Sequence, residues 1–272
     1  MPFGDNGSRL ARPRAGGRAL RCGGRVVLLA CLVAVGLCRP GQAAPGASLL
    51  PGPKATVGWW PAGVLPDSGR HSHQMLSFGG RLWVIGGVYP GQTYISTLSS
   101  ANGEDWTIEQ PNAPWGVRQG HACVIFQEKI WLFGGTDDGQ QARYADVWSS
   151  PDGVNWTNEV SAAPWAPRAE MSAVVHAGKI WLMGGNGDTG VATKALADFN
   201  DVWSSTNGRD WTLETEAADW QPRSVFGLVS FGTDMVLMGG FSNALPVKLG
   251  ESHLNDVWRS SDGKSWVQDA YP

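Results

Sequence analysis

Lys179-Ile180-Trp181-Leu182-Met183-Gly184-Gly185, followed downstream by Asn200-Asp201-Val202-Trp203-Ser204-Ser205, is the stretch that decides the fold of this 272-residue chain. The pattern recurs three more times, in Ile130–Gly135 with Asp146–Ser150, in Met235–Gly240 with Asn255–Ser260, and in Leu82–Gly87 with a weaker Ser96–Ser100. Self-similarity at a fixed period marks a repeat protein, so four copies predict an architecture built from one recurring unit.

Each copy lies in a longer unit with four short apolar segments. The first segment follows an arginine, and these arginines recur at spacings of 48, 50 and 55 residues: Arg70, Arg118, Arg168 and Arg223. The fourth segment begins at a tryptophan, at spacings of 50, 55 and 55 residues: Trp106, Trp156, Trp211 and Trp266. Four short strands in a period of about fifty residues are typical of a β-propeller blade. The sequence therefore predicts an all-β propeller with four visible four-stranded blades.

The turn residues agree with this prediction. Asn-Gly or Asp-Gly separates the third and fourth segments of every unit: Asn102-Gly103, Asp152-Gly153, Asn207-Gly208 and Asp262-Gly263. These pairs tolerate positive φ in tight turns, so we expect a hairpin in each blade. The Gly-Gly pairs predict either a φ closed to other residues or the close approach of a neighbouring chain. The tryptophans of the later strands are large enough to fill the wedge between adjacent blades.

In their order of Arg, apolar strand, Gly-Gly strand, Asp-Val-Trp and final Trp, the units resemble the kelch repeat over residues 59–272. The resemblance implies a kelch-type propeller of the galactose oxidase central-domain-like superfamily, here a non-enzymatic member. Trp59-Trp60 resembles the fourth strand of a preceding blade. Such propellers usually have about five to seven blades, so three alternatives stay open: a truncated product, a compact four-bladed ring, or an open array. Open sheet edges would favour self-association.

The N-terminal residues are typical of a secretory signal. Basic residues precede the apolar run Val26–Leu37, which is too short to span a bilayer comfortably, and Gly41-Gln42-Ala43 predicts cleavage after Ala43. We therefore expect a signal peptide over residues 1–43, a linker over 44–58, and a secreted, periplasmic or cell-surface protein without a membrane span after cleavage. A lipoprotein signal at Cys38 and an uncleaved anchor are the alternatives.

Composition excludes one class of partner and makes reactive-thiol chemistry the lesser alternative. Charged residues are 17% of the chain and the net charge is −3, with much of the basic charge in the N-terminal segment, which argues against a nucleic-acid groove. Three of the four cysteines also lie in that segment. Cys123, alone in the repeats within an apolar strand, is expected to be a small core residue.

The predicted binding face combines the arginines with the loops between the second and third strands. In an up-and-down blade, these loops and the connection into the first strand emerge on the same side, and the loops vary in length and composition. Arg70, Arg118, Arg168 and Arg223 could bind a carboxylate or sulfate there, with Tyr144 nearby. The alternative is that each Arg satisfies loop carbonyls or a neighbouring unit's Asp.

No coherent catalytic or metal set accompanies these residues, and we expect no metal and no cofactor. His73 and His121 each stand three residues after their Arg, but the matching positions are Met171 and Phe226. Copper chemistry of the galactose-oxidase type needs a Tyr–Cys cross-link and a Tyr/His copper set, and it is disfavoured because the chain has four Tyr, one Cys in the repeats and no Tyr-His pair. A kelch-type sialic-acid mutarotase would place an Arg and a Glu near the channel, and Arg168 with Glu170 is the candidate pair. Sialidase chemistry is weakly permitted by Tyr144.

The leading hypothesis is therefore a secreted or cell-envelope kelch-repeat protein that binds a protein or glycan through its loop-and-Arg face, without catalysis. The candidate ligand-binding residues share that face: Arg70, Arg118, Arg168, Glu170, Arg223 and Tyr144. The alternative function is a carbohydrate-active propeller such as a sialic-acid mutarotase or epimerase.

Overall fold

The fold was analysed in a computed structural model. It describes residues 64–66, 69–89, 92–137, 139–140, 142–188, 196–243 and 252–269. The predicted signal peptide, the linker and Trp59-Trp60 lie outside these residues. All described residues belong to the compact unit Pro51–Pro272, and they contain no helix long and apolar enough to cross a membrane.

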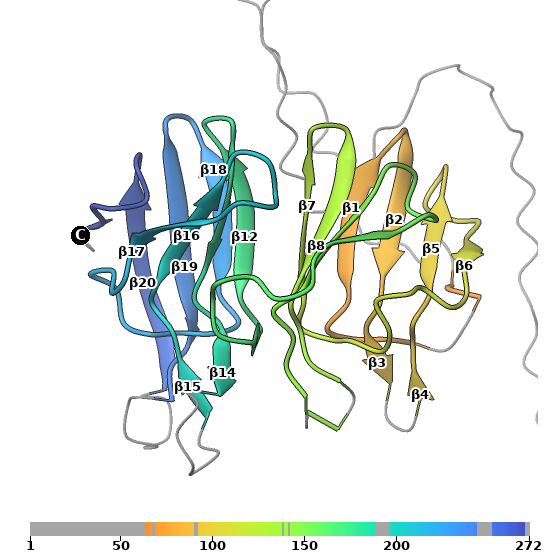
Figure 1. Ribbon diagram of the computed structural model, residues 1–272, viewed down its shortest axis with the longest axis horizontal. Coiled ribbons are helices and arrows are strands. Elements are labelled where there is room, and N and C mark those ends of the chain that lie inside the picture. Colours follow the sequence, from red (N-terminus) through yellow and green to blue (C-terminus); the bar gives the residue numbers. More distant parts are fainter. Residues whose placement is uncertain are drawn as a thin grey trace, which may run out of the picture. The chain divides into compact units, whose positions relative to one another are not determined.

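Four antiparallel four-stranded sheets form this unit, as the repeats predict (Figure 1). The first blade consists of β1 (Gln74–Phe78), β2 (Arg81–Ile85), β5 (Thr97–Ser100) and β6 (Thr107–Gln110). The second consists of β7 (Ala122–Phe126), β8 (Lys129–Phe133), β9 (Val147–Ser150) and β10 (Thr157–Val160). The third consists of β12 (Ser172–His176), β13 (Lys179–Met183), β16 (Val202–Ser205) and β17 (Thr212–Thr215). The fourth consists of β18 (Gly227–Phe231), β19 (Asp234–Phe241), β20 (His253–Ser260) and β21 (Val267–Gln268).

The first strands of consecutive blades lie side by side: β1 contacts β7, β7 contacts β12, and β12 contacts β18. The core lies between the sheets because each blade is apolar on both faces. Between the second and third blades, for example, Phe126 and Phe133 pack in one cluster with Ile180 and Leu182. Trp131 is buried in the same cluster and Trp211 packs against it, so the prediction that tryptophans fill the wedges between blades is confirmed here.

The hairpin between the third and fourth strands is present in every blade. In the second blade, the Ser150 hydroxyl accepts from the Gly153 N–H at 2.8 Å, and the Asp152 carboxylate accepts from the Val154 and Asn155 N–H groups at 2.9 and 2.7 Å. Gly153 has φ +76°, whereas Asp152 is not in the left-handed region. The predicted need for a positive φ in this turn thus holds for the glycine only, since the Asp stabilises the turn through hydrogen bonds to its side chain.

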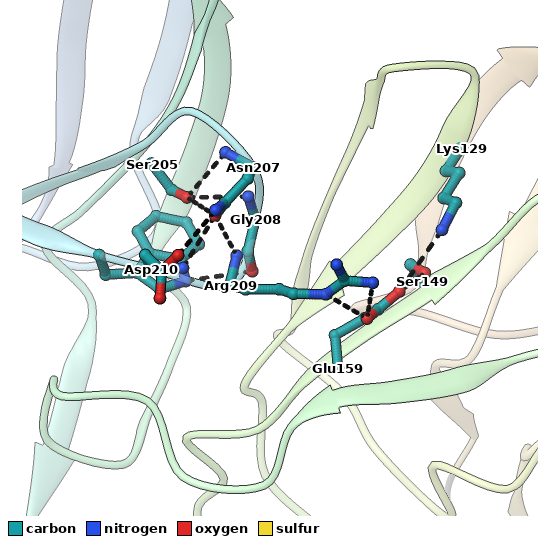
Figure 2. A network of polar contacts seen from close by, with 9 residues as sticks. Lys129, Ser149, Glu159, Ser205, Asn207, Gly208, Arg209 and Asp210 are labelled. Atoms are coloured by element: carbon teal, nitrogen blue, oxygen red, sulfur yellow. Dashed lines mark hydrogen bonds and ion pairs between the residues drawn. The ribbon is translucent and has the colours of Figure 1, made fainter.

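Contacts between blades repeat along the chain. A Cβ at Gly153 would overlap the ring of Trp83 in the preceding blade, and Gly208 and Trp131 have the same relation. The second-strand Trp of each of these blades therefore packs against the hairpin glycine of the next blade. A polar contact also joins the second and third blades: Glu159 of the second accepts from Ser149 at 2.6 Å and from Arg209 of the third at 2.6 Å (Figure 2).

The Gly-Gly pairs connect each blade to the next through the backbone. Gly134 and Gly135 have φ values of +52° and +100°, and the Gly135 N–H donates to the Arg168 carbonyl of the next blade at 2.9 Å. A Cβ at Gly135 would come within 2.9 Å of the Gln119 carbonyl oxygen. Both predicted reasons for glycine, positive φ and a close approach, are thus confirmed.

Candidate functional site

Three of the four predicted site arginines are buried in ion pairs. Arg118, Arg168 and Arg223 have side-chain exposures of 1%, 1% and 0%. Each guanidinium binds both carboxylate oxygens of the Asp in the Asp-Val-Trp sequence of its own blade: Asp146 at 2.8 and 3.0 Å, Asp201 at 2.5 and 2.8 Å, and Asp256 at 2.6 and 2.8 Å. The sequence argument considered an Asp of a neighbouring unit, and the structure corrects this to the same unit.

Carbonyl groups and an aromatic ring complete the environment of these arginines. Arg118 donates to the Gly134 carbonyl at 3.0 Å, and its guanidinium lies 4.4 Å from the ring centroid of Tyr144. Phe199 covers Arg168 in the same way at 4.2 Å. The donors of these arginines therefore face the interior of the blade. This geometry fits the alternative in which each Arg satisfies loop carbonyls and an Asp instead of binding a ligand. Tyr144 packs on Arg118 and belongs to the same structural arrangement.

The first blade has a weaker version of the same arrangement. Ser96 stands where the other blades have Asp, and Arg70 donates to its hydroxyl at 3.2 Å and to the Gly86 carbonyl at 2.9 Å. The ring of Tyr94 lies 4.1 Å from the Arg70 guanidinium. A neutral acceptor in place of a carboxylate gives a weaker hydrogen bond, which matches the weaker third-strand pattern in the sequence of this unit.

The connections into the first strands and the loops after Gly-Gly lie on one side, which we call the entry side. His71 pairs with Val88 and Ser224 pairs with Phe241. In the third blade, β11 (Arg168–Ala169) pairs with β14 (Asn186–Asp188), which pairs with β15 (Leu196–Asp198). In the first blade, β3 (Val88–Tyr89) pairs with β4 (Gln92–Thr93), at the same end as β14 and β15 (Figure 1). The predicted common side is confirmed.

A backbone ladder joins the four blades on the entry side. The second residue after each arginine has a positive φ: Ser72 at +52°, Gly120 at +60°, Glu170 at +56° and Val225 at +55°. The Gly120 N–H donates to the Ser72 carbonyl at 3.1 Å, Glu170 to Gly120 at 2.7 Å, and Val225 to Glu170 at 3.0 Å. Sequence reasoning missed this equivalence because the four residues share no chemistry, although their constant distance from the Arg was available as a signal.

Glu170 is one of the residues that line a cavity of about 230 Å³ beside this ladder. Ser72, Gln74, His121 and Ser172 also line the cavity. A Cβ at Gly120 would lie 2.6 Å from a Glu170 carboxylate oxygen, so the glycine leaves room for this side chain. Burial raises the pKa of Glu170, and the positive charges of His71 and Arg143 oppose the rise. The cavity thus holds a carboxyl group that takes up a proton more readily than one in water.

His121 lies at the wall of this cavity as a neutral core side chain. It is 1% exposed, and neither ring nitrogen has a hydrogen-bond partner in the described part of the chain. Burial, and then the charge of Arg118, lower its pKa to about 3. Its ring packs 6.3 Å from that of Trp115. A histidine held neutral in this way is a packing residue rather than a cation.

Other candidates for chemistry are few among the described residues. They contain no group of three or more His, Cys, Asp or Glu side chains placed to hold a metal ion. Cys123 is a free, half-buried thiol, and burial raises its pKa. A raised thiol pKa lowers the thiolate fraction at neutral pH, which fits the expected packing role.

Comparison with known proteins agrees with this geometry. A family model described as the KLHDC2/KLHL20/DRC7 Kelch-repeats domain matches residues 61–240. The solved structure titled "Structure of YjhT" matches with a TM-score of 0.56 and 15% sequence identity, over 73% of this chain and 68% of that chain. At this identity, the likeness to the solved structure concerns the fold alone.

Proposed function

We propose that this chain, which belongs to the kelch-repeat family, is an exported binding protein that recognises a protein or glycan on its entry side. The observation that carries this proposal is Glu170, which lines the cavity and accepts no side-chain hydrogen bond within the described residues. Kelch propellers are rigid frames that present loops, and binding residues of such frames concentrate on the loops.

The chemistry of the cavity limits what it can receive. Ligand pockets for drug-sized molecules are usually about 300–1,000 Å³, so the smaller cavity around Glu170 suits one side chain or one sugar ring of a larger ligand. Glu170 can accept hydrogen bonds from hydroxyl or ammonium groups, and Ser72, Gln74 and Ser172 add neutral donors and acceptors. Polar groups of this kind supply orientation, while the surrounding loops supply contact area. We therefore propose Glu170, rather than the four arginines, as the direct ligand contact.

A binding experiment with matched variants tests this proposal. The purified protein is incubated with an oligosaccharide array and with soluble proteins from the producing organism, and captured ligands are then re-measured with Glu170→Gln. The control is Glu104→Gln, an equal charge change on the exposed hairpin at the opposite end of the first blade. We expect the cavity variant to weaken capture by about tenfold or more, because an acceptor of a charged or bidentate hydrogen bond is lost. Equal capture by both variants would count against the site.

The second candidate is a sugar mutarotase or epimerase, which is compatible with Glu170 because burial raises the pKa of this carboxyl group and so favours its holding a proton for transfer. Arg168 is bound to Asp201, so Arg143, whose charge acts on Glu170, is the more available cation. Anomer exchange of N-acetylneuraminic acid followed by NMR tests this function. A rate equal to that of buffer alone removes it, while leaving the binding proposal intact.

Export rests on the sequence of residues 1–43. We propose that the mature chain begins at Ala44 and acts outside the cytoplasm. N-terminal sequencing of the protein recovered from the medium or cell envelope tests this proposal. A product that begins at Met1 in the cytosol would contradict it.

A further inference from the structure

The lining of the Glu170 cavity offers hydrogen-bond acceptors. Glu170 contributes a carboxylate, which can only accept when it is ionised, and it accepts no side-chain hydrogen bond within the described residues. The Ser172 hydroxyl also lines the cavity, and it donates its proton to the Phe226 carbonyl at 2.9 Å. Only the acceptor lone pairs of Ser172 are therefore left for a ligand.

Two neutral side chains from the first blade extend this acceptor set. Gln74 lines the same cavity, and a carboxamide can turn its oxygen towards a donor. The Ser72 hydroxyl lies 3.1 Å from the His71 Nδ1, and its oxygen keeps at least one lone pair for a ligand whichever of the two groups donates. The described residues that line the cavity include no Lys or Arg, so a carboxylate ligand would find no cationic partner there.

Val225 adds an exposed apolar side chain at the same cavity. It is 65% exposed and has a φ of +55°, which is an outlier for a β-branched residue. Its N–H donates to the Glu170 carbonyl at 3.0 Å, so the two residues are neighbours in the backbone ladder. Met171 and Phe226 continue the apolar wall. A ligand that fits this cavity therefore combines a donor group with an apolar stem.

The charge of the repeats selects the sign of that donor group. Residues 44–272 contain 14 Lys or Arg and 23 Asp or Glu, a formal net charge of −9, because seven of the 21 basic residues of the chain lie in residues 1–43. An acidic surface attracts cationic partners and repels anionic ones. The overall charge and the acceptors of the cavity thus both favour a cationic ligand.

From these observations we infer that the Glu170 cavity binds a lysine side chain of a basic protein partner. An ammonium group has three N–H donors and no acceptor, which matches the Glu170 carboxylate and the oxygens of Gln74 and the two serines. The aliphatic stem of the lysine can pack along Val225. Sugar hydroxyls both donate and accept, and they gain nothing from the acidic charge. This inference rests on the proposed binding at Glu170 and names the chemistry of the partner.

Titration with a blocked lysine tests this inference. The purified protein, isotope-labelled on nitrogen, is titrated with Nα-acetyl-lysine methylamide, and the backbone NMR signals of Gly120 and Val225 report binding at the cavity. We expect a dissociation constant of about 1 mM or weaker, since the probe is one side chain of a larger ligand. Acetylation of the probe at Nε removes its charge and keeps its stem, and it should weaken binding by about tenfold or more.

Matched variants separate the two parts of the site. Glu170→Gln should weaken binding of the lysine probe by about tenfold or more, whereas Glu104→Gln, on an exposed hairpin, should leave it unchanged. Val225→Gly removes the apolar contact at a position where glycine adopts the required φ without strain, so this variant should fold. It should weaken binding of the lysine probe by about threefold or more, because the stem loses its apolar contact.

Three results would overturn the inference. They are a lysine probe that shifts neither signal, equal binding of the lysine probe and its Nε-acetyl form, and shifts caused by methyl glycosides of glucose or N-acetylglucosamine where the lysine probe causes none. The third result would leave the proposed binding at Glu170 intact and make the ligand a glycan. That proposed function fails separately, when Glu170→Gln captures every ligand as well as Glu104→Gln does.

Discussion

Replacing Arg223 by methionine should destabilise the fourth blade far more than an exposed charge deletion does. Arg223 is fully buried and donates four hydrogen bonds, two to Asp256, one to the Gly239 carbonyl at 2.8 Å and one to the Gln221 carbonyl at 3.0 Å. In Arg223→Met, Asp256 retains the Trp258 indole N–H at 2.7 Å but loses both guanidinium bonds, and both carbonyls lose the Arg223 donor. The variant therefore has a buried carboxylate without its cation.

The expected magnitude follows from that burial. Removing one partner of a buried ion pair costs about 3–5 kcal/mol, and the 15% exposure of Asp256 places this case at about 3–4 kcal/mol. With a urea dependence of about 2–3 kcal/mol per molar, the unfolding midpoint should fall by about 1–2 M. The double variant Arg223→Met/Asp256→Leu should recover part of this loss, because it leaves no unpaired charge.

Urea unfolding followed by tryptophan fluorescence measures these differences, with Arg81→Met as the control. Arg81 pairs with Glu109 at 3.3 Å, but the two side chains are 38% and 27% exposed, so the control should lose at most about 1 kcal/mol. A midpoint for Arg223→Met no lower than that of Arg81→Met would refute the reasoning. So would a double variant that loses as much as the sum of the single changes.

The pH dependence gives an independent check on the same pair. Burial raises the pKa of Asp256, but hydrogen bonds from Arg223 and Trp258 outweigh it and hold the pKa below the ordinary value of 3.8. A depressed carboxyl pKa stabilises the fold above the unfolded value, and this contribution is lost as the pH falls through the folded value. Without Arg223, burial raises the pKa of Asp256, so the difference between variant and wild type should shrink as the solution is acidified.

Three further predictions concern the blade contacts and the cavity. Gly208→Ala should cost about 2–4 kcal/mol because its Cβ would overlap Trp131, whereas Gly178→Ala, at nearly the same φ but with open space, should cost about 1 kcal/mol in urea unfolding. Glu170→Gln should stabilise the fold at pH 7, where the raised pKa makes the ionised carboxyl unfavourable, and the gain should vanish in melts below about pH 4.5. The folded state resists protonation of His121, so the wild type loses stability as the pH falls from the ordinary pKa of 6.5 towards about 3. In His121→Phe, the free energy of unfolding should fall less over this pH range.

Local patterns made the fold predictable from sequence. The hairpin turns, the Gly-Gly pairs and the Trp positions each act within one blade or between successive blades, so a repeat of about fifty residues specifies them directly. Even the same-side placement of the Arg and the long loops follows from strand alternation. The ion pair between Arg118 and Asp146 shows the limit of this reasoning. Both residues recur in the repeat pattern, but only the three-dimensional structure shows that they pair within one blade.

The candidate site was predictable only in part. Glu170 was singled out by its proximity to Arg168 in the sequence, yet the structure separates their roles, since Arg168 pairs with Asp201 and Glu170 lines the cavity. Residues 168 and 170 would point to the same side of a regular extended segment, and the positive φ of +56° at Glu170 breaks that alternation, which the sequence alone does not reveal. The cavity also depends on Ser72, Gln74 and Ser172, which come from two different blades. Their proximity is a property of the assembled sheets.

The backbone ladder explains why Glu170 is the residue to test first. Each ladder position requires a φ near +55°, which costs a non-glycine residue about 1 kcal/mol or more. Gly120 meets this requirement without strain, and its missing side chain admits the Glu170 carboxyl group. Glutamate at its own position has both the backbone cost and the cost of burying a carboxylate. Neither cost is needed to complete the ladder, because the hydrogen bonds use only backbone groups. Glu170 is therefore the residue at which the proposed binding should be tested first.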